Sequence, residues 1–458
     1  MNITKLIIGC FLLGFAMPTW AQKAIRYRVY LTDKEQTAFT LEHPEAYLSA
    51  RSIQRRQKQA LPIELSDLPV SEHYVKTLEK QGVRVVTTSK WNNTVVVETT
   101  DTVQMAEQLA HLPFVKKVKK VWVSPATVSE RNKHRKKEVT NHFSKTDCLY
   151  GKAYPQIAMH HGDSLHRAGF KGKGMHIAVI DAGFYNADVI KLFKKVDVLG
   201  VHDFVNADAD LFAEQNHGMK VLSCMAVNHP HVMIGTAPEA SYWLLRSEDD
   251  DTEQPIEEDY WAAAIEFADS AGVDVVNTSL GYYAFDDAEA NYRYRDLDGH
   301  TSLMSHSASM AAGKGMVVVC SAGNSGMGAW KKVTPPGDAE HVLTVGAITK
   351  QKINADFSSV GNTADGRIKP DVMAVGFQSV VVDTNGSLTQ VNGTSFSSPT
   401  FCGLVACLWQ ACPWLKATEV IELIRQSADR YDCPDNIFGY GIPDVWKAYQ
   451  QACTIKKQ

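Results

Sequence analysis

From about Cys148 onwards, the chain repeats one pattern, in which a short, nearly continuous apolar run is followed by a stretch with helical spacing. Apolar runs without alternation are typical of strands buried on both faces, and strands that alternate with helices favour parallel pairing through helical crossovers. The pattern predicts an α/β domain with a doubly wound, mostly parallel sheet. The predicted strands are residues 175–180, 242–246, 273–278, 316–320 and 342–348, and two of the predicted helices are residues 258–270 and 302–314.

The residues before this domain predict a smaller unit of a different class. Residues 22–123 follow the order strand, helical stretch, two strands, helix, strand, with the turn signal Trp91-Asn92-Asn93 between the two central strands. We therefore expect a small α+β domain. Its predicted strands are residues 25–31, 83–88, 94–99 and 114–123, and its predicted helices are residues 44–59, 71–80 and 102–111.

A basic linker, residues 124–147, separates the two units. Most of it is polar and strongly basic and has no apolar period, which indicates an exposed segment. Two interpretations fit such a segment: a solvated tether, or a site at which the chain is cut during maturation. The export signal at the start of the chain favours the second.

The first 21 residues have the layout of a secretory signal peptide. A basic start with Lys5 precedes an apolar core at residues 6–17, which is followed by Pro18 and a small-x-small sequence ending at Ala21. The apolar core is too short for a membrane span. Because Cys10 stands before most of this core, a lipoprotein signal is disfavoured. We expect cleavage after Ala21, no membrane span in the mature protein, and a secreted or periplasmic location.

Composition and cysteine usage exclude some roles. The 458 residues carry a net charge of −4 and 21% charged residues, which argues against a nucleic-acid or membrane-surface role. Function must therefore come from individual sites. Four cysteines lie inside apolar patterns and predict buried thiols, and one disulfide is plausible within a second group; these are Cys224, Cys320, Cys402 and Cys407, and then Cys412, Cys433 and Cys453.

Three polar residues stand where a parallel sheet usually forms its site, outside the carboxyl ends of its strands. Asp181 directly follows the first predicted strand of the large domain. His217 stands at the start of a helical stretch, and Ser395 precedes the apolar stripe of another helix. We expect these three side chains to meet at one edge of the sheet.

The sequence VNGTSFSSPTFCGL, residues 391–404, has two interpretations. In the first, Thr394 or Ser395 caps a buried helix and Pro399 lies in its first turn. In the second, Ser395 is a nucleophile, because Gly393 nearby allows a substrate backbone to approach and the helix N-terminus stabilises developing negative charge. The stretch alone favours the capping interpretation.

Together, Asp181, His217 and Ser395 are the groups that a hydrolytic triad requires. A serine hydroxyl is a weak nucleophile at neutral pH, so an imidazole must accept its proton, and a carboxylate fixes the imidazole tautomer. A donor for the oxyanion is also needed. Asn324 follows the apolar run at residues 316–320, and its amide can serve with the backbone N–H of Ser395.

Four segments resemble the signatures of the subtilisin-like serine peptidases, in that family's order. They are VIDAG around Asp181, NHGMKV around His217, SAGNSG around Asn324 and NGTSFSSP around Ser395. Two further segments, VVNTSLG and GRIKPDVMAVG, are similar to supporting segments of the family. The resemblance extends over roughly residues 169–448.

The resemblance implies a serine endopeptidase that cleaves polypeptides through an acyl-enzyme. Asp181, His217 and Ser395 would form the triad, and Asn324 would complete the oxyanion hole. No cofactor is needed for this chemistry and no metal ligands are assigned; calcium, which relatives often bind at various loops, is not located by the sequence. The substrate backbone would lie along Ser279, Leu280, Gly281, Ala322 and Gly323.

The resemblance also gives the smaller unit a role. Such enzymes commonly carry an N-terminal ferredoxin-like propeptide that assists folding and inhibits the enzyme within the same chain until it is cut away. Residues 22–123 would be this propeptide and residues 148–458 the catalytic domain. We expect self-processing of the zymogen between Val123 and Cys148.

Some positions depart from the family pattern. Ala182 stands where a hydroxyl residue is usual after the aspartate, and Met219 and Phe396 replace the usual residues near His217 and Ser395. These departures bear on rate and substrate preference rather than on reaction type. The alternative function is a catalytically silent subtilase scaffold that acts as a binding module.

Overall fold

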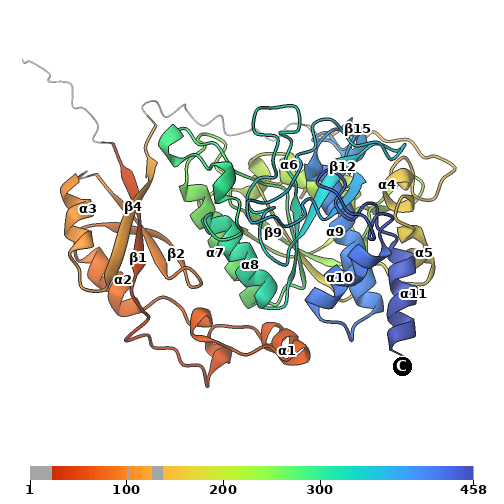
Figure 1. Cartoon of the computed structure of the whole chain (residues 1–458). Coiled ribbons are helices and arrows are strands. Elements are labelled where there is room, and N and C mark those ends of the chain that lie inside the picture. Colours follow the sequence, from red (N-terminus) through yellow and green to blue (C-terminus); the bar gives the residue numbers. More distant parts are fainter. Residues whose placement is uncertain (1–22, 101–102, 126–137, 457–458) are drawn as a thin grey trace, which may run out of the picture.

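The computed structural model describes residues 23–100, 103–125 and 138–456. The predicted signal peptide and residues 126–137 of the linker lie outside the described residues. Figure 1 shows a small sheet with its helices on one side of the molecule and a larger α/β part on the other, with α7 (Ile256–Ala271) and α8 (Leu303–Gly313) between the two sheets.

The larger part contains the predicted sheet, and every strand pair in it is parallel. Its seven strands are ordered β13-β12-β11-β10-β5-β9-β6. This confirms the α/β class predicted from the apolar runs. The strands are β5 (His176–Asp181), β6 (Asp197–Asp203), β9 (Ser241–Arg246), β10 (Val275–Thr278), β11 (Val317–Ser321), β12 (Leu343–Ile348) and β13 (Val372–Val375).

Two of these strands have no counterpart among the predicted runs. Edge strand β6 has the sequence DVLGVHD, and most of its side chains are exposed, so it lacks the apolar continuity of the central strands. Strand β13 is buried but only four residues long. Each forms because the backbone N–H and C=O groups of a neighbouring strand are free to pair with it. The local sequence pattern contains no information about that neighbour.

Helices cover both faces of the sheet. Along β5, Ile177 and Val179 pack into one hydrophobic cluster, whereas Ala178 and Ile180 pack into the cluster on the opposite face. Double coverage explains why the strands are apolar without alternation. The first face carries α4 (Tyr154–Ala158), α5 (Gly162–Arg167), α6 (His217–Ala226), α9 (Thr394–Ala411), α10 (Ala417–Ser427) and α11 (Val445–Ile455), and the second carries α7 (Ile256–Ala271) and α8 (Leu303–Gly313).

Smaller elements complete this part. Two short antiparallel pairs are formed by β7 (Asn228–His229) with β8 (Met233–Ile234) and by β14 (Ser379–Val382) with β15 (Leu388–Val391). Four 3₁₀ turns lie in its loops: η3 (Lys191–Phe193), η4 (Leu211–Ala213), η5 (Ala288–Ala290) and η6 (Tyr294–Asp296).

The small domain has an antiparallel sheet ordered β2-β3-β1-β4 with helices packed on it. This is the order of a ferredoxin-like fold and confirms the α+β prediction. Its elements are β1 (Ile25–Leu31), α2 (Glu72–Glu79), β2 (Arg84–Ser89), β3 (Thr94–Thr99), α3 (Val103–Ala110) and β4 (Val115–Val123).

The helix predicted over residues 44–59 is divided in the structure. A 3₁₀ turn η1 (Pro44–Ala46) is followed by a separate helix α1 (Ala50–Gln59). The division arises because the Ser49 side chain accepts a hydrogen bond from the Ser52 backbone N–H and caps the new helix. Another 3₁₀ turn, η2 (Leu65–Asp67), comes before α2.

No helix in the described ranges is long and apolar enough to cross a membrane. The eight cysteines in these ranges are all free thiols, and the four predicted to be buried are buried. The disulfide that the sequence made plausible near the C-terminus is not formed in this structure. Cys412 is buried at the end of α9, whereas Cys433 is exposed on a loop.

Candidate active site

Asp181 is the last residue of β5 and is fully buried. Its Oδ1 atom accepts hydrogen bonds from the Ala182 backbone N–H at 2.8 Å and from His217 Nδ1 at 2.7 Å. Its Oδ2 atom is buried and has no hydrogen-bond partner among the described residues. Residue 182 is alanine, so its side chain has no hydroxyl that could donate a hydrogen bond to this oxygen.

His217 begins α6, and the following glycine lets this helix approach β5 closely. A Cβ atom at Gly218 would stand 2.5 Å from the carbonyl oxygen of Gly183 and 2.9 Å from Asp181 Cβ. Burial lowers the pKa of His217, but the adjacent Asp181 carboxylate outweighs this and leaves the pKa above its ordinary value. The imidazole is thus oriented through Nδ1, and its other edge faces the cleft.

Ser395 lies in the first turn of α9, but neither hydroxyl residue caps that helix. The N-cap is Gly393, which makes no side-chain capping bond. Instead, Thr394 Oγ1 accepts a hydrogen bond from the Gly323 N–H at 3.1 Å and donates one to Asn324 Oδ1 at 3.0 Å. The capping interpretation is wrong for Thr394 and Ser395, because the hydroxyl of Thr394 joins α9 to the loop after β11.

Pro399 was expected in the first turn, but it lies further inside α9. A proline there cannot donate to the carbonyl oxygen four residues earlier, which belongs to Ser395. That oxygen accepts a hydrogen bond from Ser279 Oγ at 3.0 Å instead. The proline thus frees a carbonyl that ties Ser395 to the loop following β10.

The neighbouring serines have partners outside the cleft. Ser397 Oγ donates to the carbonyl oxygen of Thr394, and Ser398 Oγ donates to Asn277 Oδ1. Among the residues that the structure describes, Ser395 Oγ makes only a long contact of 3.4 Å, with the carbonyl oxygen of Ser279. In this structure no hydrogen bond joins Ser395 Oγ to His217.

Asn324 is exposed in the loop after β11. Its Oδ1 atom accepts hydrogen bonds from the backbone N–H and the hydroxyl of Thr394, at 2.9 and 3.0 Å. Because the oxygen is used in this way, the amide orientation is set and the Nδ2 donors remain for the cleft.

These residues line one open cleft of about 390 Å³. Of the predicted substrate contacts, Ser279, Leu280, Gly281 and Gly323 line it. Ala322 does not, because its side chain packs into a small hydrophobic cluster behind the loop. The complete lining is Ala182, Gln215, His217, Glu248, Asp250, Ser279, Leu280, Gly281, Tyr283, Ser321, Gly323, Asn324, Ser325, Thr334, Thr394 and Ser395.

The acidic run at residues 247–259 has two interpretations from sequence: a solvated loop that leads into a helix, or a source of electrostatic preference for basic substrate residues. The sequence alone did not place this run at the cleft, but Glu248 is half-buried and lines the cleft with Asp250. Burial and the nearby Asp181 carboxylate raise the pKa of Glu248 to about 8. Its position in the sequence could have predicted this place, because the run follows the carboxyl end of β9, the strand that pairs with β5, and sites form at that end of a parallel sheet.

No group of three or more His, Cys, Asp or Glu side chains within the described ranges is arranged to hold a metal ion. Asp298, in the loop between η6 and α8, accepts hydrogen bonds from the N–H groups of His300 and Thr301 and from the Thr301 hydroxyl. Its oxygens thus stabilise their own turn.

His217, Ser395 and Asn324 line one cleft at the carboxyl ends of a parallel sheet, and Asp181 is hydrogen-bonded to His217 behind it, an arrangement typical of serine hydrolases. Comparison with known families narrows this class. The model described as "Subtilase family" matches residues 172–441, and "Peptidase S8 propeptide domain, Bacteroidota" matches residues 26–141. The chain belongs to the subtilase family of serine peptidases and carries a propeptide domain of that family.

Individual relatives are distant. The chain is 30% identical over 277 residues to a thermophilic serine proteinase of Bacillus sp. (strain AK1), a match that spans 60% of this chain and 61% of that protein. It is 29% identical over 294 residues to subtilisin DY of Bacillus licheniformis, across 63% of this chain and 95% of the relative.

Among solved structures, the MycP3 protease of the type VII (ESX-3) secretion system has a similar fold. The TM-score is 0.52 at 21% identity, over 69% of this chain and 92% of that one. At this identity the similarity concerns the fold alone.

Proposed function

We propose that this chain is an exported serine endopeptidase, made as a zymogen that processes itself, with Asp181, His217 and Ser395 as its catalytic triad. Ser395 Oγ attacks the carbonyl carbon of a peptide bond while His217 accepts the hydroxyl proton. Asp181 holds the imidazole by its Nδ1–H and stabilises the imidazolium. His217 then returns the proton to the leaving amine.

The acyl-enzyme is released by the reverse sequence. A water molecule attacks the ester carbonyl, His217 accepts its proton, and the Ser395 hydroxyl is regenerated. In both steps the oxyanion would accept hydrogen bonds from the Asn324 amide and the Ser395 backbone N–H. The observation that supports these roles most strongly is the 2.7 Å hydrogen bond between buried Asp181 and His217, in the cleft that Ser395 also lines.

The propeptide acts as an intramolecular inhibitor in this proposal. Its sheet packs beside α7, and its last strand ends at Val123, whose backbone exchanges hydrogen bonds with the Gln254 side chain. The chain then continues through the basic linker and is held again at Asn141, whose N–H donates to the Asn385 carbonyl oxygen. Cleavage between Val123 and Cys148 would separate the two domains, with export directed by residues 1–21.

The test is paired expression of the wild-type chain and the Ser395→Ala variant, with intact mass as the readout. We expect the wild type to lose about 12 to 15 kDa from its N-terminus, the mass of the propeptide and linker, while the variant loses only its signal. Identical cutting of both chains would assign the processing to another protease.

A silent subtilase scaffold is the second candidate. One observation is compatible with it: the Ser395 hydroxyl contacts the Ser279 carbonyl oxygen rather than His217. Hydrogen bonds between catalytic groups are often long before substrate binds, so this geometry fits both candidates. A serine-directed fluorophosphonate probe separates them, because it labels Ser395 in the cleaved chain only if that serine is activated.

A further inference from the structure

We propose that the catalytic domain has a second docking surface for its propeptide, far from the cleft, which keeps the propeptide bound after the linker is cut. The docking element is residues 32–70, which we call the hook. The surface, which we call the base, is formed where α7 and α8 end and β10 and β11 begin. The inference rests on the proposed function only in assuming that the linker is cut during maturation.

The hook leaves the small sheet and returns to it. It connects β1 to α2 and contains η1, α1 and η2. In Figure 1, α1 lies well away from the small sheet and below α8, toward α10. The Ser49 backbone N–H donates to the Ser270 carbonyl oxygen at 2.9 Å, which places the start of α1 against the end of α7. The order of the small fold does not require such an excursion.

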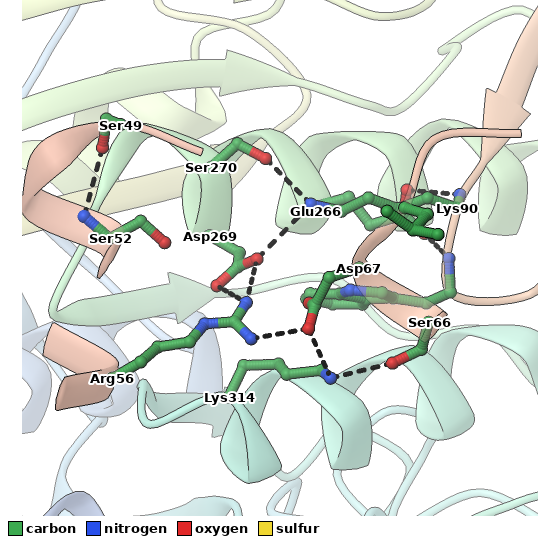
Figure 2. A network of polar contacts seen from close by, with 12 residues as sticks. Ser49, Ser52, Arg56, Ser66, Asp67, Lys90, Glu266, Asp269, Ser270 and Lys314 are labelled. Carbon is green, nitrogen blue, oxygen red and sulfur yellow. Dashed lines mark hydrogen bonds and ion pairs between the residues drawn. The ribbon is translucent and has the colours of Figure 1, made fainter. Parts of the chain in front are cut away.

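Buried charges of opposite sign meet between the hook and the base, although Arg55 Nε, Arg56 Nε and Asp67 Oδ1 have no hydrogen-bond partner among the described residues. Asp269, near the end of α7, is completely buried and forms ion pairs with Arg55 and with Arg56, the latter through both oxygens at 2.8 and 2.9 Å. Arg56 also reaches Asp67 at 2.9 Å, and Lys314 of the base contacts Asp67 at 3.2 Å. Figure 2 shows Arg56, Asp67, Asp269 and Lys314 converging between the two domains.

Backbone groups of the base are bound as well. Arg51 donates to the carbonyl oxygens of Gly272 and Gly174 at 2.9 and 2.8 Å. Gln59 donates to the carbonyl oxygen of Gly315 at 2.8 Å and accepts from the Ala417 N–H at 2.9 Å. Carbonyl oxygens at the ends of helices attract donors, so an arginine-bearing helix matches the chemistry of the base.

Helix α7 therefore carries two separate anchors. Near its start, buried Asp259 pairs with Arg28 of β1, with contacts of 2.6 Å. Asp269 lies ten residues further along, a distance of about 15 Å on a helix. Two sites joined by one chain must release together before the partner diffuses away, so bivalent docking slows dissociation strongly. Cutting the linker alone leaves both anchors intact.

The experiment uses the full chain carrying Ser395→Ala, with the recognition sequence of an added protease inserted into the linker. After folding, the protease cuts the linker, and the rate at which the propeptide leaves a catalytic domain tagged at its C-terminus is measured. Arg56→Gln is compared with Lys58→Gln, which removes the same charge from an exposed position of the same helix. We expect Arg56→Gln to accelerate release at least tenfold and Lys58→Gln to leave it unchanged.

Arg51→Gln is a milder second variant, because the Arg51 side chain is partly exposed. It replaces Arg56→Gln in the experiment if that variant does not fold. We expect it to accelerate release about threefold. Equal release rates for wild type, Arg51→Gln and Arg56→Gln would overturn the proposal. Because the cut is made by an added protease, the result does not depend on whether the chain processes itself.

Discussion

Two aspartates of the catalytic domain are equally buried but have opposite surroundings. Asp181, at the carboxyl end of the sheet, pairs with a half-exposed histidine and leaves one oxygen unpaired. Asp269, near the opposite end, is surrounded by Arg55, Arg56 and Lys90. In the functions proposed above, charge pairing at the base serves propeptide binding, whereas the incomplete pairing at the cleft leaves groups available for chemistry.

The largest expected effect comes from removing the charge of Asp181. Asp181→Asn should lower peptide hydrolysis by about 10⁴-fold, because the amide favours the wrong His217 tautomer. At a pH above the folded-state pKa of His217, where the imidazole is neutral, the free energy of unfolding should not fall, since a buried and incompletely paired carboxylate is replaced by a neutral group. Hydrolysis of a chromogenic peptide and urea unfolding measure the two quantities. Retained activity would remove Asp181 from the proposed triad.

Asp269→Asn should have the opposite effect to Asp181→Asn, because it should lower the stability of the fold. In a Ser395→Ala chain, Asp269→Asn should lower the free energy of unfolding by about 3–5 kcal/mol, because Arg55 stays buried without a charged partner and Arg56 keeps only Asp67. Asp208→Asn, at an exposed position, is the control. A loss below about 1 kcal/mol, the range of surface pairs, would contradict the tight pairing seen at the base.

Asn324 offers a smaller test within the cleft. Asn324→Ala should lower kcat by about 10²- to 10³-fold, a range that comes from a subtilisin. Ser325→Ala changes a neighbouring side chain of the same cleft and serves as the control. If both variants hydrolyse peptides at the same rate, the Asn324 amide does not hold the oxyanion.

Acid should affect the two regions in different pH ranges. The pKa of His217 lies above its ordinary value of 6.5, and only the neutral imidazole accepts a proton, so activity should rise with pH through a midpoint above 6.5. The stabilisation from the charged pair with Asp181 is complete below that ordinary value and is lost as pH rises through the folded-state pKa.

The pKa of Asp269 is lowered, because Lys90, Arg55 and Arg56 outweigh the effect of burial. Its contribution to stability is present above the ordinary aspartate value and is lost only as pH falls below it. Activity and unfolding profiles measured together would separate the two midpoints. A single shared midpoint would mean that zymogen opening, and not His217, governs the pH dependence.

How well the sequence anticipated the fold depended on how local each signal was. The central strands are apolar on both faces, so their positions follow from the residues themselves, and β5 and β9 begin within one residue of prediction. Edge strand β6 carries no such signal. The prediction for Pro399 failed because the partner of the freed Ser395 carbonyl, Ser279, is distant in sequence.

The sequence alone determined the fold class of both domains, because apolar periodicity is a local property of a chain. It also identified Asp181, His217, Ser395 and Asn324 as candidate site residues, because short motifs are local as well. Only the tertiary structure decided that Glu248 lines the cleft and that the hook reaches the base. Those outcomes depend on which strands become neighbours and on where buried charges meet their partners, and no window of consecutive residues contains that information.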